Sequence, residues 1–455
     1  GGGAFDVYRI CEALASVDLG VATGVLATFL GSEPIRFGGT EEQKQRWLGR
    51  IAEDGLLMAY CATEPEAGSD QGALRSQAER VEKDGEIVGY KIEGNKQWIS
   101  NGGFADLYSV LAIAPQGPTW FVVERGTEGL TYGHPEDKHG IRASNTAAVS
   151  FSDVYVDQTS MVGGVEGQGL IQAQNVFGYT RLMVAAFGLG AGWAALDRAI
   201  PYSTERIQGG SPLSEKQGYT HKLIVPHVVR LEAARAFIEE TAERIDSGEG
   251  TLNTEGAIAK YLASEAGLAA ADAAIQALGG YGYTREYMVE KIRRDVRITT
   301  IYEGPSEILQ GIIGTHRWRM VARSKGGFYR DMAGTVNDIE TGRTAALAAD
   351  ALAELFLVGH TTKLPREPGA LCELARLATE VETAVEMAIK ASRDSSPQSE
   401  FFDLCARLHG LSAARDVAQT GLRLLHASGR YDTEAIKGWR KTAGFEACLE
   451  ASSGE

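Results

Sequence analysis

The spacing of apolar residues changes twice along this chain of 455 residues, and that change most constrains its fold. Residues 5–57 follow a helical repeat, residues from about 56 to 160 form short alternating or β-branched segments, and helical spacing returns from Gly169 onward. Asp84-Gly85 separates two of the short segments, as expected of a hairpin turn. Because no strand alternates with a long helix, the pattern argues against a doubly wound nucleotide-binding fold.

These segments predict an α+β fold that is mainly α. Its expected parts are an N-terminal helical domain (1–57), a middle antiparallel β domain (58–160), a C-terminal four-helix bundle (161–324) and a helical extension (325–455). The expected strands cover residues 57–63, 77–82, 87–92, 98–100, 107–114, 120–123 and 147–156. The expected later helices cover residues 169–205, 214–247, 252–278, 303–323, 331–358, 368–393, 399–427 and 432–449. Near the start, Gly38–Glu42 predicts an N-cap, followed by a helix that buries Trp47.

Charge, cysteines and histidines restrict the function classes. The 60 Asp and Glu residues exceed the 45 Lys and Arg residues, and the net charge of −15 argues against a nucleic-acid partner. The five cysteines form no CxxC pair and the eight histidines no HExxH motif, which favours a reducing compartment and predicts no metal site. The longest uncharged run, Leu182 to Leu196, has 15 residues and is too short to span a bilayer, so we expect no transmembrane segment.

The chain begins with three glycines rather than with Met. This start indicates an incomplete N-terminus, which would hide any targeting peptide. We favour a cytoplasmic, bacterial protein, and we keep the mitochondrial matrix as the alternative because the N-terminus is incomplete.

Glycine is abundant, with 55 residues against 12 prolines, which indicates many tight turns or close backbone approaches. The segment 188–192, Gly-Leu-Gly-Ala-Gly, resembles a dinucleotide-binding fingerprint. However, Trp193 stands where the third glycine is needed, and no strand precedes the segment. Close packing between helices is therefore the better interpretation.

The first candidate binding segment runs from Tyr60 to Asp70 and leaves an expected strand for a polar turn. Thr63 and Ser69 supply hydroxyl groups, and Gly68 leaves backbone N–H groups accessible, a combination that suits contact with a ligand. An ordinary Ser- and Asp-rich turn is the alternative, which composition alone favours.

The second candidate segment, Asn95 to Gly103, places Trp98 and Ser100 two residues apart on one expected strand. An indole beside a hydroxyl could stack on a flat cofactor and hydrogen-bond its edge. A core tryptophan with a solvent-facing serine fits the segment equally well.

The third candidate segment, Ile298 to Glu307, leads from apolar residues into Glu303 and a Gly304-Pro305 break. A carboxyl group in apolar surroundings resists ionisation, which suits a general base, and Gly304 would let another molecule approach the backbone. The alternative is a helix start at which Glu303 or Glu307 complements the helix dipole, and this segment alone favours it.

Together, the three segments resemble the acyl-CoA dehydrogenase family of flavoproteins. The resemblance extends from the first residues to about residue 318, and its motifs occur in the expected order and spacing. They cover Tyr60–Asp70, Lys96–Gly103, Gly140–Val156, Phe177–Arg181, Gln276–Tyr283 and Arg294–Gln310. The resemblance implies an acyl-CoA dehydrogenase-like fold with three such domains and with FAD held between subunits.

The resemblance also implies which residues bind FAD and substrate. Thr63 and Ser100 would hydrogen-bond the flavin ring, and Trp98 would pack against it. Further FAD contacts are implied for Tyr60, Gly68 and Ser69. The ADP half of FAD would be contacted by residues of a neighbouring subunit: Arg206, Gln217, Gln276, Gly279 and Gly280. The implied substrate contacts are Ser69, which would face the pantetheine, and Phe177, Arg181, Tyr302 and Gly304.

Glu303 matches the catalytic base of the family. The implied reaction removes the α proton of an acyl-CoA thioester and transfers the β hydride to flavin N5, which gives the trans-2-enoyl-CoA. The backbone N–H of the base residue and a ribityl hydroxyl of FAD would polarise the thioester carbonyl. Some members carry the base directly before the arginine equivalent to Arg181, but that position is Thr180 here, which cannot act as a base.

The sequence departs from the family pattern at several positions. Gly178 replaces an acidic residue that often helps to bind CoA, and Pro305 and Glu307 replace the usual Thr and Gln after the base. The segment Arg206-Ile-Gln-Gly-Gly lacks the common aromatic residue, which weakens the expected cross-subunit contact. None of these changes removes a catalytic group.

The region after residue 325 resembles the extra helical region of very-long-chain members, which implies a homodimer, with a tetramer as the alternative. Leu26 would shorten the acyl pocket whereas the extension suggests a long substrate, so chain length and branching stay open. The resemblance implies β-oxidation of fatty acids, with an electron-transfer flavoprotein as electron acceptor. The alternatives are an oxidase-type enzyme that uses O2 and an inactive paralogue that serves as an assembly or binding partner.

Overall fold

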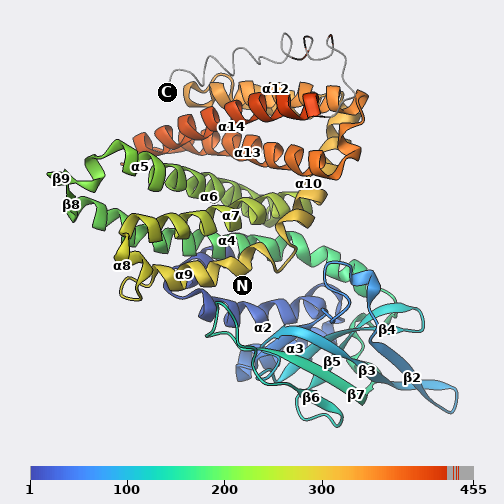
Figure 1. Ribbon diagram of the computed structural model, residues 1–455. Helices are drawn as coiled ribbons and strands as arrows, with labels where there is room; N and C mark the ends of the chain where they lie inside the picture. Colours follow the sequence, from blue (N-terminus) through green and yellow to red (C-terminus); the bar gives the residue numbers. More distant parts are fainter. Residues whose placement is uncertain (1, 428–433, 435–436, 438, 440–455) are drawn as a thin grey trace. The chain divides into compact units, whose positions relative to one another are not determined.

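The computed structural model describes residues 2–427 together with Glu434, Lys437 and Trp439 (Figure 1). Its contacts divide the chain into two compact units, one of Ala13–Met183 and one of Gly1–Glu12 with Val184–Glu455. The unit boundaries fall within the helices α1 (Ala4–Val17) and α4 (Gly169–Glu205). The four domain ranges expected from the sequence stay a prediction.

Three helices precede the β domain: α1, α2 (Leu19–Gly38) and α3 (Glu41–Asp54). Thr40 caps α3, since its side chain accepts the N–H of Gln43 while the Gln43 side chain bonds back to the N–H of Thr40. The predicted N-cap is therefore confirmed. Trp47 of α3 is buried, as expected, in a cluster that includes Met58 and Trp120 of the β domain.

The β domain forms one seven-stranded sheet in the order β1-β4-β2-β3-β7-β6, with β5 paired to β4. The strands are β1 (Met58–Cys61), β2 (Gln77–Lys83), β3 (Glu86–Ser100), β4 (Leu107–Ala114), β5 (Gly117–Glu124), β6 (Leu130–Tyr132) and β7 (Thr146–Asp157). Short 3-10 turns lie at η1 (Gln71–Ala73), η2 (Gln158–Ser160) and η3 (Val162–Gly164). One side of the sheet packs into a core around Ile92, Val110 and Phe121, and the other carries Trp120 of β5, which packs in one cluster with Trp47 of α3.

Three details of the sheet correct the sequence prediction. The expected strands 87–92 and 98–100 are one strand, β3, whose register against β7 shifts at two places. The short strand β6 was not expected. The domain is not wholly antiparallel, because β1 pairs with β4 in parallel, and β2 meets β4 in parallel at one position. A parallel pair needs a long connection between its strands, which residues 62–106 supply for β1 and β4.

The second unit begins with a helical bundle. Its helices are α4, α5 (Gln217–Leu223), α6 (Val225–Asp246), α7 (Asn253–Leu278), α8 (Gly280–Tyr283), α9 (Val289–Val296) and α10 (Ser306–Ser324). Between them lie β8 (Ile207–Gln208), β9 (Ser211–Pro212), η4 (Leu213–Glu215) and η5 (Arg297–Thr300). The bounds of α4 are as predicted, but the expected helix 214–247 is divided at Ile224 because Pro226 suits only the first turn of a new helix. The helix expected from residue 303 begins at Ser306, and the short helices α8 and α9 were missed.

Glycines bring α4 and α7 close together. A Cβ atom at Gly188 would lie 2.5 Å from the carbonyl oxygen of Ala263, and one at Gly267 would lie 2.1 Å from that of Gly188. Packing of helices, rather than nucleotide binding, therefore explains the glycine-rich segment 188–192. Among the described residues, the stretch Phe177–Glu205 is long and apolar enough to cross a membrane, but 78% of its most apolar window is buried inside the protein.

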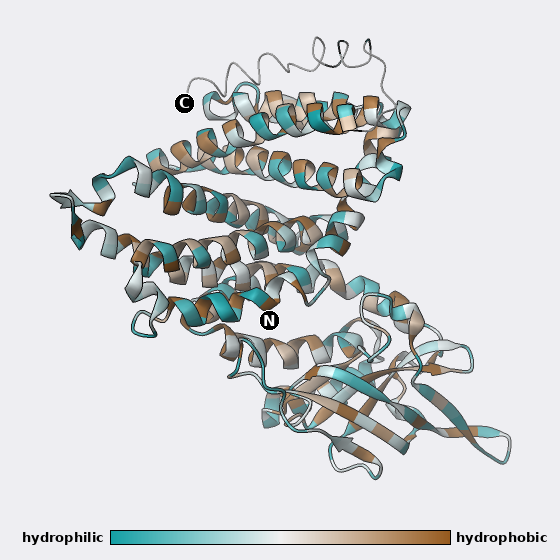
Figure 2. Cartoon of the chain, in the orientation of Figure 1, coloured by the Kyte–Doolittle hydropathy of each residue, from teal (hydrophilic) through white to brown (hydrophobic). Residues whose placement is uncertain are grey.

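The extension adds α11 (Gly327–Val336), η6 (Glu340–Gly342), α12 (Arg343–Thr361), η7 (Leu364–Arg366), α13 (Pro368–Arg393) and α14 (Ser399–Ala427). The bounds of α13 and α14 are as predicted, whereas the expected helix 331–358 is two helices. The expected helix 432–449 falls outside the described residues, apart from three isolated positions. Figure 1 shows α13 and α14, in orange and red, beside α6, which they contact. In Figure 2, hydrophobic and hydrophilic residues alternate along these helices, as expected of helices with one buried face.

Candidate active site

The unit Ala13–Met183 brings the first two candidate segments together. The N–H of Gln97, beside Trp98, donates to the carbonyl oxygen of Thr63 at 3.0 Å. Thr63 and Ser100 are half-buried, whereas Gly68 and Ser69 are exposed. The turn that follows β1 therefore lies along the end of β3, so hydroxyl groups and an indole that are distant in sequence lie within one region.

Trp98 is exposed and has an unusual backbone. Its φ of 61° lies in the left-handed region, where β3 shifts register against β7 between Lys96 and Ile99. Its side chain is 61% exposed, so the core-tryptophan alternative is wrong. A bulky residue in this conformation is rare and commonly marks a functional constraint. The exposed indole is available to a flat ligand.

A buried ion pair that the sequence did not reveal supports this region. The Lys96 Nζ donates to Glu64 Oε1 at 2.7 Å and to the carbonyl oxygen of Leu111 at 2.6 Å, and neither charged side chain is more than 2% exposed. Glu64 also accepts the N–H groups of Arg75 and Ser76, at 2.6 Å and 3.1 Å. Glu64 follows Thr63 and Lys96 precedes Trp98 by two, so the pair ties the turn to the strand.

The two partners differ in how burial affects them. Burial lowers the pKa of Lys96, although its bond to Glu64 acts in the opposite direction. Burial alone would raise the pKa of Glu64, but the hydrogen bonds that it accepts, above all from Lys96, hold that pKa below its usual value. We take Glu64 to be ionised, since three donors converge on it.

Phe177 and Arg181 lie on the part of α4 that belongs to the same unit. The guanidinium carbon of Arg181 is 5.1 Å from the centre of the Phe177 ring, and Arg181 is buried. This contact orients both predicted substrate residues on one helix.

The second unit holds Glu303 in a turn between η5 and α10. Glu303 and Gly304 both have left-handed backbones, with φ of 53° and 97°, and both are half-buried, as is Tyr302. Because α10 starts only at Ser306, Glu303 lies outside its first turn, and the helix-start interpretation applies to Glu307 alone.

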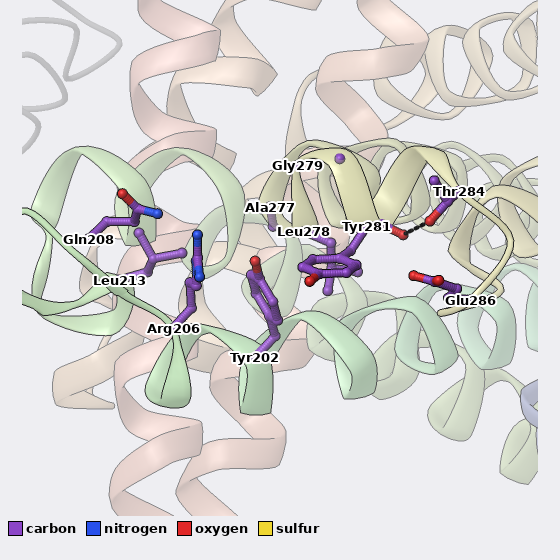
Figure 3. A pocket seen from close by; sticks show the side chains of 11 residues that line it. Tyr202, Arg206, Gln208, Leu213, Ala277, Leu278, Gly279, Tyr281, Thr284 and Glu286 are labelled. Carbon is purple, nitrogen blue, oxygen red and sulfur yellow. Dashed lines mark hydrogen bonds between the residues drawn. The ribbon is translucent and has the colours of Figure 1, made fainter.

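A cavity of about 630 Å³ in the same unit collects three of the predicted cofactor residues (Figure 3). Arg206 directly follows α4, Gly279 caps the end of α7 and Gly280 begins α8. A Cβ atom at either glycine would meet nothing within 4 Å, so the backbone there is open to a ligand. The other lining residues are Tyr202, Gln208, Leu213, Ala277, Leu278, Tyr281, Thr284 and Glu286.

The sequence analysis missed the aromatic side of this cavity. Figure 3 shows Tyr202 between Arg206 and Tyr281, and the rings of Tyr202 and Tyr281 are 6.2 Å apart. Gln276 and Gln217 are both exposed, but neither lines the cavity. Within the described part of the chain, no group of His, Cys, Asp and Glu residues could hold a metal ion.

Three family models match the chain: the N-terminal domain of acyl-CoA dehydrogenase at residues 1–54, its middle domain at 59–154 and its C-terminal domain at 167–317. An acyl-CoA dehydrogenase of Bacillus subtilis (strain 168) is 37% identical over 325 residues, which are 70% of this chain and 84% of that protein. The chain belongs to the acyl-CoA dehydrogenase family. Family membership confirms the predicted fold and the enzyme class, an oxidoreductase of fatty acid oxidation.

Two solved structures extend the comparison with the acyl-CoA dehydrogenase family. Butyryl-CoA dehydrogenase from Megasphaera elsdenii is 38% identical, with 70% of this chain and 82% of that chain covered and a TM-score of 0.66. An acyl-CoA dehydrogenase from Bacillus anthracis complexed with FAD is 22% identical and has a TM-score of 0.81, with 97% and 83% covered. At 22% identity, the similarity to the Bacillus anthracis structure concerns the fold alone. Because 97% of this chain is covered, that similarity includes the helical extension.

Proposed function

We propose that this acyl-CoA dehydrogenase uses FAD and converts an acyl-CoA thioester to the trans-2-enoyl-CoA, with Glu303 as the base. The observation that carries the proposal is Glu303 itself, a half-buried carboxyl group on a turn whose backbone is left-handed at two consecutive residues. Such strained turns cluster at active sites, where they aim a side chain or an N–H group. FAD, when bound, supplies the acceptor for the β hydride.

The side chains of both units fit FAD. Trp98 offers an exposed ring face, and Thr63 and Ser100 offer hydroxyl groups close by, which suits the flavin ring. Arg206 beside the open backbone of Gly279 suits a pyrophosphate group. As the family resemblance implies, this second set would serve the FAD of a neighbouring subunit, so we also propose a homodimer.

We assign the proton transfer to residues of this chain. Glu303 takes the α proton, and its backbone N–H donates to the thioester carbonyl, which makes that proton more acidic. Thr180, at the alternative base position, is buried and has no group that accepts a proton at neutral pH. Ser69, Phe177, Arg181, Tyr302 and Gly304 are the proposed substrate contacts.

An anaerobic titration tests this function. The purified protein should show a flavin spectrum, and one length of acyl-CoA in a panel should bleach it fastest, which would identify the substrate class. Glu303→Gln should keep the flavin but bleach at least about 1,000-fold more slowly, whereas Glu307→Gln, an exposed residue of the first turn of α10, should bleach normally. Undiminished bleaching by Glu303→Gln would refute the assigned base, and absence of flavin would favour the inactive paralogue.

We further propose that an electron-transfer flavoprotein accepts the electrons. The reduced enzyme should be reoxidised rapidly by that flavoprotein and slowly by air. Rapid reoxidation by air alone would instead identify an oxidase.

A further inference from the structure

Helix α7 holds the segment that carries Glu303 through a row of polar side chains on one of its faces. Four α7 residues take part, at positions 260, 261, 264 and 265, a spacing that places them on the same side of a helix. The hydrogen bonds are Lys260 Nζ to Gly304 O at 2.7 Å, Ser264 Oγ to Thr299 O at 3.1 Å, Ser306 Oγ to Glu265 Oε1 at 2.6 Å, and Gln310 Nε2 to the Tyr261 hydroxyl at 2.9 Å. The turn is thus anchored before, at and after Glu303.

Lys260 stands out in this row because it is completely buried. A lysine is rarely found in the interior unless its amino group has a partner there. The carbonyl that it reaches belongs to Gly304, the residue directly after Glu303. Of the four bonds named above, this one reaches the residue nearest to Glu303 in the chain.

The backbone at this point needs such a contact. Glu303 has φ of 53°, a conformation that disfavours residues with a side chain and that persists only where the surroundings enforce it. The Gly304 carbonyl belongs to the peptide that joins Gly304 to Pro305, so this bond fixes the end of the short turn that Glu303 begins and restricts how far its backbone can relax. The directions of the Glu303 carboxyl group and N–H depend on that backbone conformation.

We propose that Lys260 is a positioning residue for the catalytic base. Its bond to Gly304 holds Glu303 in the left-handed conformation in which the Glu303 carboxylate can take the α proton of the substrate. The inference rests on the proposed role of Glu303. Lys260 acts through the turn and takes no proton from the substrate. Without its amino group, Glu303 can relax to negative φ and its carboxyl group moves away from the reacting carbon.

Hydrogen–deuterium exchange tests the turn without any need for turnover. In Lys260→Met, amide exchange in a peptide spanning residues 298–308 should rise at least tenfold, while exchange in the β domain stays unchanged. Tyr261→Phe, which removes the neighbouring contact to Gln310, is the matched control and should leave exchange at residues 300–304 as it is. Lys260→Arg keeps a donor at this position. Its exchange rate in the same peptide should therefore lie between those of the wild type and Lys260→Met. Wild-type exchange in a folded Lys260→Met would overturn the proposal, and where Lys260→Met fails to fold the same holds for Lys260→Gln, whose side chain is too short to keep the bond to Gly304.

Flavin reduction then tests the consequence for the base. With saturating acyl-CoA, the flavin of Lys260→Met should be reduced 10- to 100-fold more slowly than that of the wild type. The Kd of the substrate should change less than threefold. The isotope effect of α-deuterated substrate should rise and that of β-deuterated substrate should not, and Lys260→Arg should recover part of the rate. A normal rate in Lys260→Met would overturn the positioning role. If no acyl-CoA reduces even the wild type, the proposed function fails instead, and the exchange data alone decide whether Lys260 holds the turn.

Discussion

Each of the two reactive regions contains a fully buried lysine that donates to a backbone carbonyl, that of Leu111 for Lys96 and that of Gly304 for Lys260. Lys96 joins the flavin-side turn to β3 through the buried carboxylate of Glu64, a bond from one side chain to another. Lys260 bonds to a backbone carbonyl, that of Gly304, next to the base. A buried charge pair leaves an uncompensated charge when it is broken, whereas a bond to a carbonyl fixes the orientation of one peptide. We therefore expect Lys96 to matter most for stability and Lys260 most for reaction rate.

The largest effect is expected for Lys96→Met. This change leaves Glu64 buried with its cation removed, which should lower the free energy of unfolding by about 3–5 kcal/mol. Urea denaturation followed by tryptophan fluorescence measures the loss. Lys91→Met is the control on the same strand: its pair with Asp153 is exposed and should contribute less than about 1 kcal/mol. Equal losses in both variants would contradict the role of the buried pair.

A half-buried carboxyl group of the extension should behave in the opposite way to Glu64. Burial, helped by the nearby carboxylate of Glu240, raises the pKa of Glu386 on α13 to about 7, although Arg244 lowers it. The stability that its protonated form contributes is complete below the unfolded pKa of about 4.5 and is lost as the pH rises through about 7. The difference corresponds to at most about 3 kcal/mol.

Glu386→Gln removes this titration. The variant and the wild type should be equally stable near pH 4.5, and the variant should be more stable above pH 8, by at most about 3 kcal/mol. Unfolding free energies measured at both pH values test the sign. Glu82 is an exposed residue of β2, so Glu82→Gln should differ from the wild type by the same amount at both pH values. If the wild type instead gains stability relative to Glu386→Gln as the pH rises, the assignment is contradicted.

The stability of Lys260→Met sharpens the comparison. Loss of the donor to a partly buried carbonyl should cost about 1–3 kcal/mol, less than Lys96→Met, although the effect on flavin reduction should be larger. Denaturation of both variants under one set of conditions gives the ranking. If Lys260→Met proves the more destabilising change, Lys260 is chiefly a structural residue.

The sequence predicted long elements better than contacts between them. The bounds of α4, α13 and α14 were correct because long helical periodicity leaves few alternatives, whereas the break at Ile224 depended on the local effect of Pro226. Glu303, Thr63 and Trp98 were found through motifs in the chain. Their individual roles stay predictions.

The supporting lysines were out of reach for a physical reason. Lys96 and Glu64 are 32 residues apart and come from different elements, and a lysine in a sequence is normally read as a surface residue. Lys260 lies in an Ala-rich helix, where nothing local indicates that its partner is the backbone after the base, 44 residues later. Only the fold reveals such pairings, since they depend on which elements pack together.

The smallest effect is expected for Ser264→Ala, which removes another α7 contact of the same segment. Its hydroxyl donates to the carbonyl oxygen of Thr299 at 3.1 Å and is buried, so the loss should be about 1 kcal/mol. Because Thr299 lies four residues before Glu303, at the end of η5 rather than in the turn, the rate of flavin reduction should change less than twofold. Thermal denaturation and stopped-flow reduction measured together separate the two quantities. A rate loss as large as that of Lys260→Met would show that any loosening of α7 against this segment disturbs the base. The bond to Gly304 would then matter no more to the reaction rate than the other contacts of α7.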